Sequence, residues 1–480
     1  MTIHLYNTLS RQAEPLITRE EGKVSMYVCG VTPYDYPHLG NARAVVAFDI
    51  IRRYLEYSGY QVMYVQNFTD VDDKIINRSN EMGVPWYTLP ERFIKVYFEE
   101  MDSLNVKRAS VYPKATENIP EIISLVQALV EKGYAYEIDG DVYYDVRKFA
   151  PYGELSNRDI DEMRSGARVE VSEQKRDPLD FALWKSAKPG EPSWGSPWGP
   201  GRPGWHIECS AMSLKYLGAG FDIHGGGQDL IFPHHENEIA QSEGALGNDM
   251  FARYWLHNGF VTINKEKMSK SLGNFFTVRE ILEQYAPEVV RYFLTSAHYR
   301  SPLDFSTEAL DHAKAAYERL RLGVFNLARV LTAGEESADD WPEQSADLLR
   351  SLEAAEADFR SAMDDDFNTA KAVVVLFDLT AEANKLINSK QFTPDATALK
   401  ALSDTRALIL RLADILGVHL IPEERAESAL VPQMMELLIA LRTQARQRKD
   451  YAQSDAIRDH LRDIGIILED TPQGTVWRKT

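Results

Sequence analysis

The chain has 480 residues, a net charge of −19 at pH 7 and a hydrophobic fraction of 44%. This length predicts three or four domains, and this composition is typical of a globular protein. No apolar run approaches the roughly 20 residues of a membrane-spanning helix, and no basic stretch followed by an apolar one opens the chain, so we expect neither a membrane protein nor a secretory signal.

The acidity argues against a protein that binds nucleic acid without specificity. It leaves room for a local basic face that binds one folded RNA, because phosphate contacts depend on local Lys and Arg. Cys29 and Cys209 are the two cysteines of the sequence, too few for a disulfide framework in a chain of this length. Reduced thiols in the cytoplasm are therefore expected, with metal ligation as the alternative role.

The beginning of the chain predicts a strand, a turn, a helix and a second strand. Residues 24–29 are a short apolar run, and 33–41 have the composition of a turn. Residues 42–57 show helical apolar spacing, and 60–67 alternate like a strand. Such a unit is parallel and right-handed, and it predicts the start of a doubly wound sheet.

The next part predicts an insertion over residues 115–204. Within it, 119–132 favours a helix, and 134–144 favours a hairpin around an Asp-Gly turn. Residues 188–204 are dense in Pro, Gly and Trp and predict an ordered loop. The sheet pattern resumes at 221–223.

From about Thr307 the pattern is almost entirely helical. An acidic polar stretch at 333–344 predicts an exposed loop, and 424–432 predicts a second connection. A short strand at 464–468 and a turn at 472–474 are expected near the end. The expected fold class is therefore α/β: a Rossmann-like doubly wound parallel sheet with an inserted connective domain, then an all-α helical bundle and a small C-terminal domain.

The segment His38-Leu39-Gly40-Asn41 follows a predicted strand and opens a predicted helix. Free backbone N–H groups at such a position favour an anion. Gly40 would let a ligand approach the backbone, and His38 would donate a hydrogen bond to a phosphate. A helix-capping turn with an ordinary histidine explains the segment equally well, since short motifs match by chance.

The segment Lys267-Met268-Ser269-Lys270-Ser271 places two lysines around small hydroxyl residues. A cationic loop of this kind can close over a triphosphate and stabilise charge in the transition state. A solvated basic turn is the alternative for such a segment alone. Its pairing with the His38 segment, about 230 residues upstream, favours a nucleotide site.

A third segment runs from His224 through three glycines and Gln228 to Asp229. The glycines would let a flat nucleoside lie on the backbone, and Asp229 would accept hydrogen bonds from ribose hydroxyls. A structural tight turn is the alternative, but it accounts for neither His224 nor Asp229.

The segment from Pro233 to Glu238 predicts the start of a helix with Pro in its first turn. His234 and Glu238 are four residues apart and would share one helix face. One His, one carboxylate and two thiolates would be an acceptable zinc set. Cys29 and Cys209 form no CxxC motif, however, and a single cysteine is more often a small buried hydrophobe.

Together these segments resemble the class I aminoacyl-tRNA synthetases, and among them the cysteinyl-tRNA synthetase family. The resemblance spans nearly the whole chain. Besides the His38, His224, Pro233 and Lys267 segments, it is carried by Leu5-Tyr6-Asn7-Thr8-Leu9, Tyr27-Val28-Cys29-Gly30, Asn67-Phe68-Thr69-Asp70-Val71-Asp72-Asp73-Lys74, Gly204-Trp205-His206-Ile207-Glu208-Cys209-Ser210, Met363-Asp364-Asp365-Asp366-Phe367-Asn368-Thr369 and Pro472-Gln473-Gly474-Thr475.

The resemblance implies ATP-dependent activation of L-cysteine to cysteinyl-adenylate and its transfer to the 3′-terminal adenosine of tRNA(Cys). It implies Mg²⁺ with the ATP and one zinc ion per chain. The implied zinc ligands are Cys29, Cys209, His234 and Glu238. The implied cysteine-binding residues are Thr69, Trp205, His206 and His224. The implied ATP-binding residues are His38, Gly40, Asn41, Gly226, Gly227, Asp229, Lys267 and Lys270, of which His38, Lys267 and Lys270 are the implied catalytic residues.

One position departs from the class signature, in which the segment beginning at His38 ends in a second histidine. Here that position is Asn41, which donates a hydrogen bond but carries no positive charge. We expect activity to be retained, because Lys267 and Lys270 remain to contact the phosphates.

The resemblance also predicts the domain division and the partner. The expected domains are a first catalytic half (1–114), a connective insertion (115–204), a second catalytic half (205–260), a stem-contact region with the lysine motif (261–315), a helical bundle (316–416) and an anticodon-binding domain (417–480). Residues 441–480 hold eight Lys or Arg against six acids, as RNA contact requires. The predicted anticodon contacts are Arg446, Asp455 and Asp470, with Tyr451 and Trp477 as stacking or packing aromatics; a solvated helical face is the alternative. The family is usually monomeric.

Two other functions fit part of the pattern. A ligase that joins cysteine to an aminosugar in mycothiol synthesis would share the catalytic core, but it needs no anticodon domain, and the segment 474–477 argues against it. A catalytically inactive RNA-binding paralogue is the other candidate. The four zinc positions and both lysines argue against that function.

Overall fold

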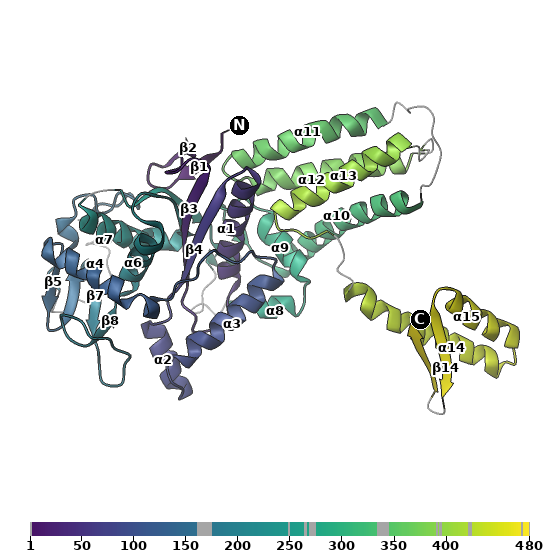
Figure 1. Ribbon diagram of the computed structural model, residues 1–480, viewed down its shortest axis with the longest axis horizontal. Coiled ribbons are helices and arrows are strands. Elements are labelled where there is room, and N and C mark those ends of the chain that lie inside the picture. Colours follow the sequence, from purple (N-terminus) through teal and green to yellow (C-terminus); the bar gives the residue numbers. More distant parts are fainter. Residues whose placement is uncertain are drawn as a thin grey trace. The chain divides into compact units, whose positions relative to one another are not determined.

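The computed structural model describes residues 2–160, 175–247, 250–263, 266–267, 275–333, 345–389, 392, 396–420, 425–471 and 474–479. The chain divides into two compact units, Met1–His419 and Leu420–Thr480 (Figure 1). Among the described residues, no helix combines the length and apolarity that a membrane crossing requires.

The centre of the first unit is a parallel sheet with the strand order β10-β9-β3-β4. Its strands are β3 (Lys23–Val31), β4 (Gln61–Phe68), β9 (Phe221–Gly227) and β10 (Ala252–Asn258). The middle of β3 is continuously buried, as expected for a parallel strand covered on both faces. The chain passes from β3 to β4 on one side and later adds β9 and β10 on the other side. The switch point of the sheet therefore lies between β3 and β9.

Helix α1 (Leu39–Tyr57) connects β3 to β4 and confirms the expected strand–helix–strand unit. It begins at Leu39 rather than at residue 42, because His38 and Asn41 cap its first turn. Two further helices, α2 (Asp73–Met82) and α3 (Thr88–Ser103), follow β4.

An antiparallel sheet with the order β5-β6-β7-β8 packs beside the parallel sheet (Figure 1). Its strands are β5 (Ala135–Ile138), β6 (Asp141–Tyr144), β7 (Phe181–Ser186) and β8 (Gly201–Pro203). The hairpin predicted over 134–144 is confirmed. Residues 201–203, expected within a loop, form an edge strand against β7. Three helices share one hydrophobic core with this sheet: α4 (Ile119–Glu131), α6 (Trp205–Leu217) and α7 (Glu236–Leu246).

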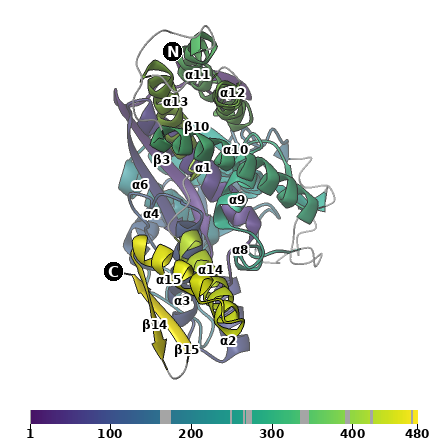
Figure 2. The ribbon, with the colours of Figure 1, turned by 90° about the vertical axis from the view of Figure 1, so that its right-hand side faces the viewer.

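The helical prediction from Thr307 onward is confirmed. Four helices lie side by side in both ribbon views (Figures 1 and 2): α10 (Thr307–Ala333), α11 (Ser345–Asp364), α12 (Thr369–Ile387) and α13 (Ala396–Ile415). Two shorter helices, α8 (Val278–Leu282) and α9 (Pro287–Thr295), precede them. The expected loop at 333–344 lies outside the described residues from 334 on.

Two small sheets complete the first unit. Strands β1 (His4–Asn7) and β2 (Gln12–Pro15) form an antiparallel pair. Strands β11 (Val261–Ile263), β12 (Glu266–Lys267) and β13 (Leu303–Asp304) form a sheet with β11 in the middle, antiparallel to β12 and parallel to β13. The second of these sheets matters for the site, because β11 follows directly from β10 and β12 ends at Lys267.

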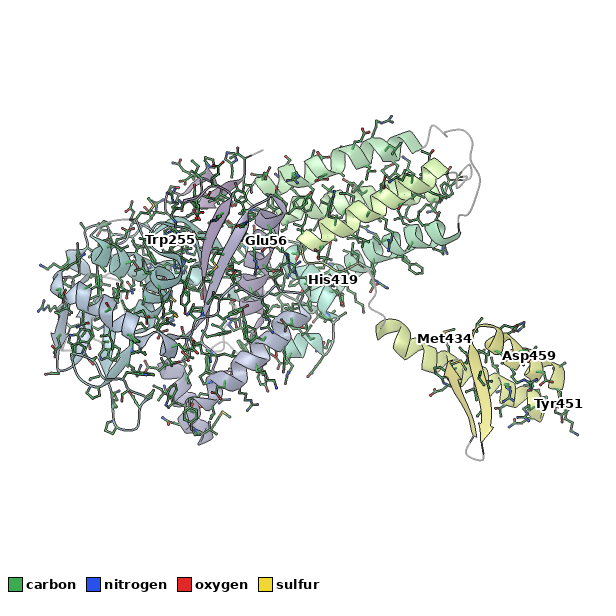
Figure 3. All side chains as sticks on the ribbon, viewed as in Figure 1. Glu56, Trp255, His419, Met434, Tyr451 and Asp459 are labelled. Atoms are coloured by element: carbon green, nitrogen blue, oxygen red, sulfur yellow. The ribbon has the colours of Figure 1, made fainter. Side chains whose placement is uncertain are left out.

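The second unit consists of two helices and a hairpin. These are α14 (Arg425–Gln447), α15 (Tyr451–Asp463), β14 (Ile466–Thr471) and β15 (Gly474–Lys479). Figure 3 labels Met434, Tyr451 and Asp459 in this unit, and His419 at the end of the first. The strand predicted at 464–468 is present as β14, and the turn predicted at 472–474 lies outside the described residues at 472 and 473.

The connection predicted over 424–432 is wrong from residue 425 onward, because α14 begins there. Proline inside a helix costs about 3 kcal/mol relative to alanine, so Pro432 suggested a break. The residues from Arg425 to Leu430 are mostly strong helix formers, however, and α14 continues through Pro432.

Candidate active site

A pocket of about 300 Å³ lies at the carboxyl ends of the parallel strands. Each of the four strands contributes to its lining: Cys29 of β3, Gln66 of β4, Gly227 of β9 and Asn258 of β10. Open α/β sheets bind ligands at this edge, beside the point where the strand order reverses. The location therefore fits the nucleotide site predicted from the sequence.

Most of the predicted ATP-binding residues meet at this pocket. His38, Gly40, Asn41, Gly227 and Asp229 all line it, as does Trp205 of the predicted cysteine site. Lys267 ends β12, and its side chain lies outside the described residues, as does all of Lys270. The predicted residues Thr69, His206, His224 and Gly226 are not among the described residues that line the pocket.

His38 and Asn41 form a reciprocal cap at the start of α1. The backbone N–H of Asn41 donates to Nδ1 of His38 at 3.2 Å, and the backbone N–H of His38 donates to Oδ1 of Asn41 at 3.0 Å. Because Nδ1 accepts a hydrogen bond, neutral His38 carries its proton on Nε2, which is then a donor. The capping role and the ligand-binding role that the sequence left open are compatible in this geometry.

The three consecutive glycines of β9 have different reasons to lack a side chain. A Cβ on Gly225 would overlap the ring of Phe48, and a Cβ on Gly226 would lie 2.8 Å from Cε1 of His235. A Cβ on Gly227 would lie 2.5 Å from Oδ1 of Asp229. Two of the glycines thus accommodate packed rings, and the third lies in the pocket lining.

One wall of the pocket was not predicted from the sequence. It consists of residues 258–261, at the end of β10 and the start of β11, and Lys74 lines the pocket as well. The Asn258-Gly259 pair after an apolar run was a usable signal for a strand end. Lys74 closes a segment already noted for its resemblance, but its spacing alone gave no reason to single it out.

Four potential metal ligands meet beside the pocket: Cys29 of β3, Cys209 of α6, His234 of the turn Ile231–His235, and Glu238 of α7. The Cys29 sulfur lies 3.7 Å from the Cys209 sulfur, 3.4 Å from Nε2 of His234 and 3.3 Å from Oε1 of Glu238. Nε2 of His234 lies 3.0 Å from the same carboxylate oxygen. Three of the four side chains are buried and Cys29 is half-buried.

These residues fit a tetrahedral zinc ion in both chemistry and spacing. Zinc bound by thiolates at about 2.3 Å and by His or carboxylate at about 2.0 Å would hold neighbouring donors roughly 3.3–3.8 Å apart. The distances above lie close to this range. The expected helix start at Pro233 is modified, since Ile231–His235 is a π-helical turn and α7 begins at Glu236.

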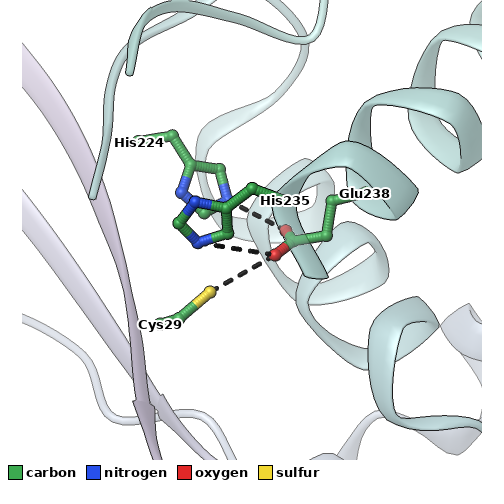
Figure 4. Close-up of side chains that lie close together, drawn as sticks. All are labelled: Cys29, His224, His235 and Glu238. Atoms are coloured by element: carbon green, nitrogen blue, oxygen red, sulfur yellow. Dashed lines mark hydrogen bonds and ion pairs between the residues drawn. The ribbon is translucent and has the colours of Figure 1, made fainter. Parts of the chain in front are cut away.

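A second set of four shares two members with the first. It consists of Cys29, His224, His235 and Glu238 and is drawn in Figure 4. Nε2 of His224 contacts the other carboxylate oxygen, Oε2, at 2.9 Å, whereas Nε2 of His235 lies 4.0 Å from Oε1. His224 therefore serves best to orient the Glu238 carboxylate. The first set also offers two cysteine sulfurs, a ligand type that zinc favours.

The charges of the first set, which is Cys29, Cys209, His234 and Glu238, favour the binding of a cation. Burial opposes ionisation of Glu238, but His224 and His234 outweigh it and lower the pKa of that carboxyl to about 2. The hydrogen bond with Cys29 lowers the pKa of Cys209 to about 6, and burial raises the pKa of Cys29. Burial lowers the pKa of His234, but Glu238 and Cys209 outweigh it and raise the pKa of this imidazole to about 10. A proton on His234 therefore balances the buried carboxylate and thiolate, and a bound cation would take over that role.

Aromatic and polar side chains contact the potential ligands and restrict their orientation. Nδ1 of His206 lies 2.8 Å from Nδ1 of His234, which leaves Nε2 of His234 for the cluster. The Trp205 ring centroid lies 4.5 Å from that of His234, and His224 stacks on Trp255 at 4.4 Å. Three of the four predicted cysteine-binding residues therefore surround the predicted metal ligands.

The predicted anticodon residues belong to the second unit. Arg446 of α14 and Asp455 of α15 are exposed, and Asp455 forms an ion pair with Arg458 at 3.2 Å. Tyr451 is 62% exposed and Trp477 is half-buried. The side chain of Asp470 lies outside the described residues.

The fold and site define a class I tRNA synthetase. Residues 16–315 match the family of tRNA synthetases class I (C) catalytic domains, residues 358–420 match the DALR domain, and residues 430–478 match the cysteinyl-tRNA ligase anticodon binding domain. Two solved structures share the fold at low sequence identity. A Mycobacterium tuberculosis methionyl-tRNA synthetase in complex with methionyl-adenylate has a TM-score of 0.59 and 18% identity, with 82% of this chain and 89% of that chain covered. The LeuRS of a ternary complex from Agrobacterium radiobacter has a TM-score of 0.62 and 12% identity, with 84% and 85% covered.

Full-length relatives give the narrower assignment. The cysteine–tRNA ligase of Heliobacterium modesticaldum is 53% identical over 482 residues, with 100% of both chains covered. The cysteine–tRNA ligase of Desulforudis audaxviator is 55% identical over 482 residues, again with 100% of both chains covered. The chain therefore belongs to the cysteine–tRNA ligase family, and the expected fold class and family are confirmed.

Proposed function

We propose that this chain activates L-cysteine with Mg²⁺-ATP to form cysteinyl-adenylate and transfers the cysteinyl group to the 3′-terminal adenosine of tRNA(Cys). The observation that carries the proposal is the position of Cys29. This residue lines the nucleotide pocket and is also a member of the four-ligand cluster. A substrate held at the cluster would thus lie next to a nucleotide held at the strand ends.

The pocket residues have distinct roles in this proposal. The Nε2–H of His38 donates to a phosphate oxygen, Asp229 accepts hydrogen bonds from the ribose, and Gly40 and Gly227 let the ligand approach the backbone. Lys267 and Lys270 stabilise the negative charge that develops on the phosphates. The backbone N–H of Asn41 holds His38 in its donor tautomer, and the Asn41 side chain holds the His38 backbone.

Cys29, Cys209, His234 and Glu238 would hold one zinc ion. When bound, zinc lowers the pKa of the substrate thiol and favours its thiolate, which the harder serine hydroxyl does not match. Trp205, His206 and His224 shape the pocket around the substrate, together with Thr69. Thr69 is buried, and its hydroxyl accepts a hydrogen bond from the Asn67 amide at 3.4 Å.

The second unit would bind the anticodon of tRNA(Cys), through Arg446, Asp455 and Asp470 with Tyr451 and Trp477 as aromatic partners. Its match to an anticodon binding domain supports this role. We further propose that the protein is a cytoplasmic monomer. The proposed domains are 1–114 and 205–260 (catalytic), 115–204 (connective), 261–315 (stem contact), 316–416 (helical bundle) and 417–480 (anticodon binding).

The two rival functions are less well supported. An aminosugar ligase would share the catalytic centre, but residues 430–478 match an anticodon binding domain. An inactive paralogue would have no need for a buried carboxylate and two thiols within ligand distance of one another.

Transfer of labelled cysteine to total tRNA, with ATP and magnesium, tests the proposal. We expect cysteine charging and no serine charging. Lys270→Ala should slow adenylate formation by at least about 100-fold, the typical loss when one group that stabilises a transition state is removed. Cysteine activation without transfer to tRNA would instead favour the aminosugar ligase, and absence of both activities in a zinc-loaded protein would favour the inactive paralogue.

A further inference from the structure

A buried carboxylate lies in the turn between α11 and α12, far from the pocket in sequence. Asp366 is 5% exposed. Asp366 and Phe367 both have positive φ angles, 56° and 54°. Non-glycine residues keep such a conformation only where their surroundings hold them in it, and such residues cluster at functional places.

The side chain of Asp366 contacts Tyr6 of β1 and, above all, a short segment that precedes β13. Its Oδ1 accepts the hydroxyl of Tyr299 at 2.9 Å and the backbone N–H of Tyr6 at 2.9 Å. Its Oδ2 accepts Nε–H of Arg300 at 2.5 Å and lies 3.5 Å from Nε2 of His298. One carboxylate therefore fixes three consecutive residues, 298–300.

Segment 298–300 supports the pocket wall formed by residues 258–261. The carbonyl of Tyr299 accepts the backbone N–H of Gly259 at 2.8 Å, and a Cβ on Gly259 would overlap the carbonyl of Ser301. The Gln228 side chain, next to Asp229, donates to the carbonyl of Arg300 at 3.4 Å. Asp366 is thus two contacts away from Gly259 of the pocket wall and from Gln228, the neighbour of the pocket residue Asp229.

The same segment leads into the sheet that carries Lys267. It continues as β13, whose Leu303 donates its N–H to the carbonyl of Phe260 at 2.9 Å and pairs with Val261 of β11. β11 in turn pairs with β12, in which Lys267 lies opposite Thr262. A displacement of segment 298–300 would move both the pocket wall and the strand that ends at Lys267.

We propose that Asp366 is a positioning residue for ATP, which acts through segment 298–300 on the wall 258–261 and on β12. It links the helical bundle to the nucleotide pocket, and this role rests on the proposed function of that pocket. Loss of the charge on Asp366 should weaken ATP binding more than it slows the chemical step, because segment 298–300 contacts the pocket residue Gly259 directly but reaches Lys267 only through two successive strand pairings.

The test compares Asp366→Asn with Asp365→Asn. Asparagine keeps the Oδ1 acceptor but removes the charge that pairs with Arg300. The neighbouring Asp365 is exposed and contacts Lys371 at 3.0 Å, so its variant changes the same charge without touching segment 298–300. In ATP–pyrophosphate exchange, we expect Asp366→Asn to raise the KM for ATP about tenfold and to change kcat per active site less than about twofold. Asp365→Asn should match the unmodified protein in the KM for ATP and in kcat. The KM for cysteine should be unchanged in both variants.

A merely structural role for Asp366 would lower the fraction of active sites and leave the KM for ATP unchanged, and that result would overturn the proposal. Arg300→Gln should reproduce the KM effect, and the double variant should be no worse than either single one, because both act through one contact. Arg300→Gln also serves as the test if Asp366→Asn does not fold. Calorimetric titration with ATP in the absence of cysteine separates the two proposals. A protein that binds ATP without exchanging pyrophosphate would refute the proposed function, while the ATP affinity of the variants would still decide the role of Asp366.

Discussion

At the residue scale, two adjacent histidines are alternative ligands of one candidate metal site. His234 and His235 each complete a set of four with Cys29 and Glu238. We predict that His234→Asn lowers zinc affinity by at least about 100-fold, whereas His235→Asn keeps one zinc per chain, because only His234 lies within 3.4 Å of Cys29 and 3.0 Å of Glu238. Metal content after dialysis against a chelator measures this.

The opposite result, with zinc lost in His235→Asn and kept in His234→Asn, would move the metal to the set in Figure 4. Equal loss in both variants would point to a general collapse of the cluster. Circular dichroism of the two proteins would reveal such a collapse.

Asn41 offers a second prediction, at the position where the class signature has histidine. Asn41→Ala removes the side-chain oxygen that accepts the backbone N–H of His38. The free energy of unfolding should therefore fall by about 1 kcal/mol, as for other lost helix caps. The KM for ATP should rise as well, since the orientation of His38 is then less restricted. Urea unfolding and pyrophosphate exchange measure the two effects. Unchanged stability would show that the cap is absent in solution.

Much of the candidate site could be assembled from the sequence, because its parts lie in short segments. The spacing of His234 and Glu238 was sufficient to place both on one side of a helix start. The partition of the Glu238 oxygens between His224 and Cys29 was not predictable, because it depends on how β3, β9 and α7 pack. The same holds for Asp366, whose partners are more than 60 residues away in sequence.

At the scale of elements, Glu100 of α3 makes the free energy of unfolding depend on pH. This side chain is 5% exposed and lies 3.8 Å from Arg279 of α8. Burial raises its pKa to about 7, although Arg279 opposes the shift. The folded state therefore binds this proton more tightly than the unfolded state. The stabilisation that protonated Glu100 contributes is complete below about pH 4.5 and is lost as the pH rises through about 7.

We predict that Glu100→Gln makes stability less dependent on pH and is the more stable protein at pH 8, by on the order of 2 kcal/mol. Glu99→Gln is the matched control, because Glu99 lies on the same helix with a side chain that is 56% exposed. Urea unfolding at pH 5 and pH 8 measures the difference. Identical pH dependence in the two variants would contradict the prediction.

Element predictions succeeded where the pattern was local and failed where it was not. The hairpin at 134–144 has its turn and both strands within eleven residues. Strand β8 spans only Gly201–Pro203, and its pairing partner β7 lies about 15 residues away, so composition alone favoured a loop. For α14, Pro432 led to the prediction of a connection, although helix-forming residues precede it. In the structure the helix continues through this proline.

At the scale of the whole molecule, the pocket and the metal cluster both lie within Met1–His419. We predict that a protein truncated after His419 keeps cysteine-dependent pyrophosphate exchange within about twofold. Transfer to tRNA(Cys) should fall steeply, because the anticodon contacts are absent. Exchange and charging assays on the same preparation measure both. Loss of exchange in a folded, zinc-loaded fragment would show that Leu420–Thr480 contributes to the catalytic centre.

The end of β3 limits how the length of this protein can vary. Cys29 belongs to both the pocket and the metal cluster, and a Cβ on Gly30 would overlap the carbonyl of Asn67. Successive side chains of a strand point to opposite faces, so one residue inserted or deleted within Lys23–Val31 would turn Cys29 away from Cys209 and press a side chain against Asn67. A scan of single-residue insertions should therefore find a stretch here that accepts none, even at positions where individual substitutions are accepted.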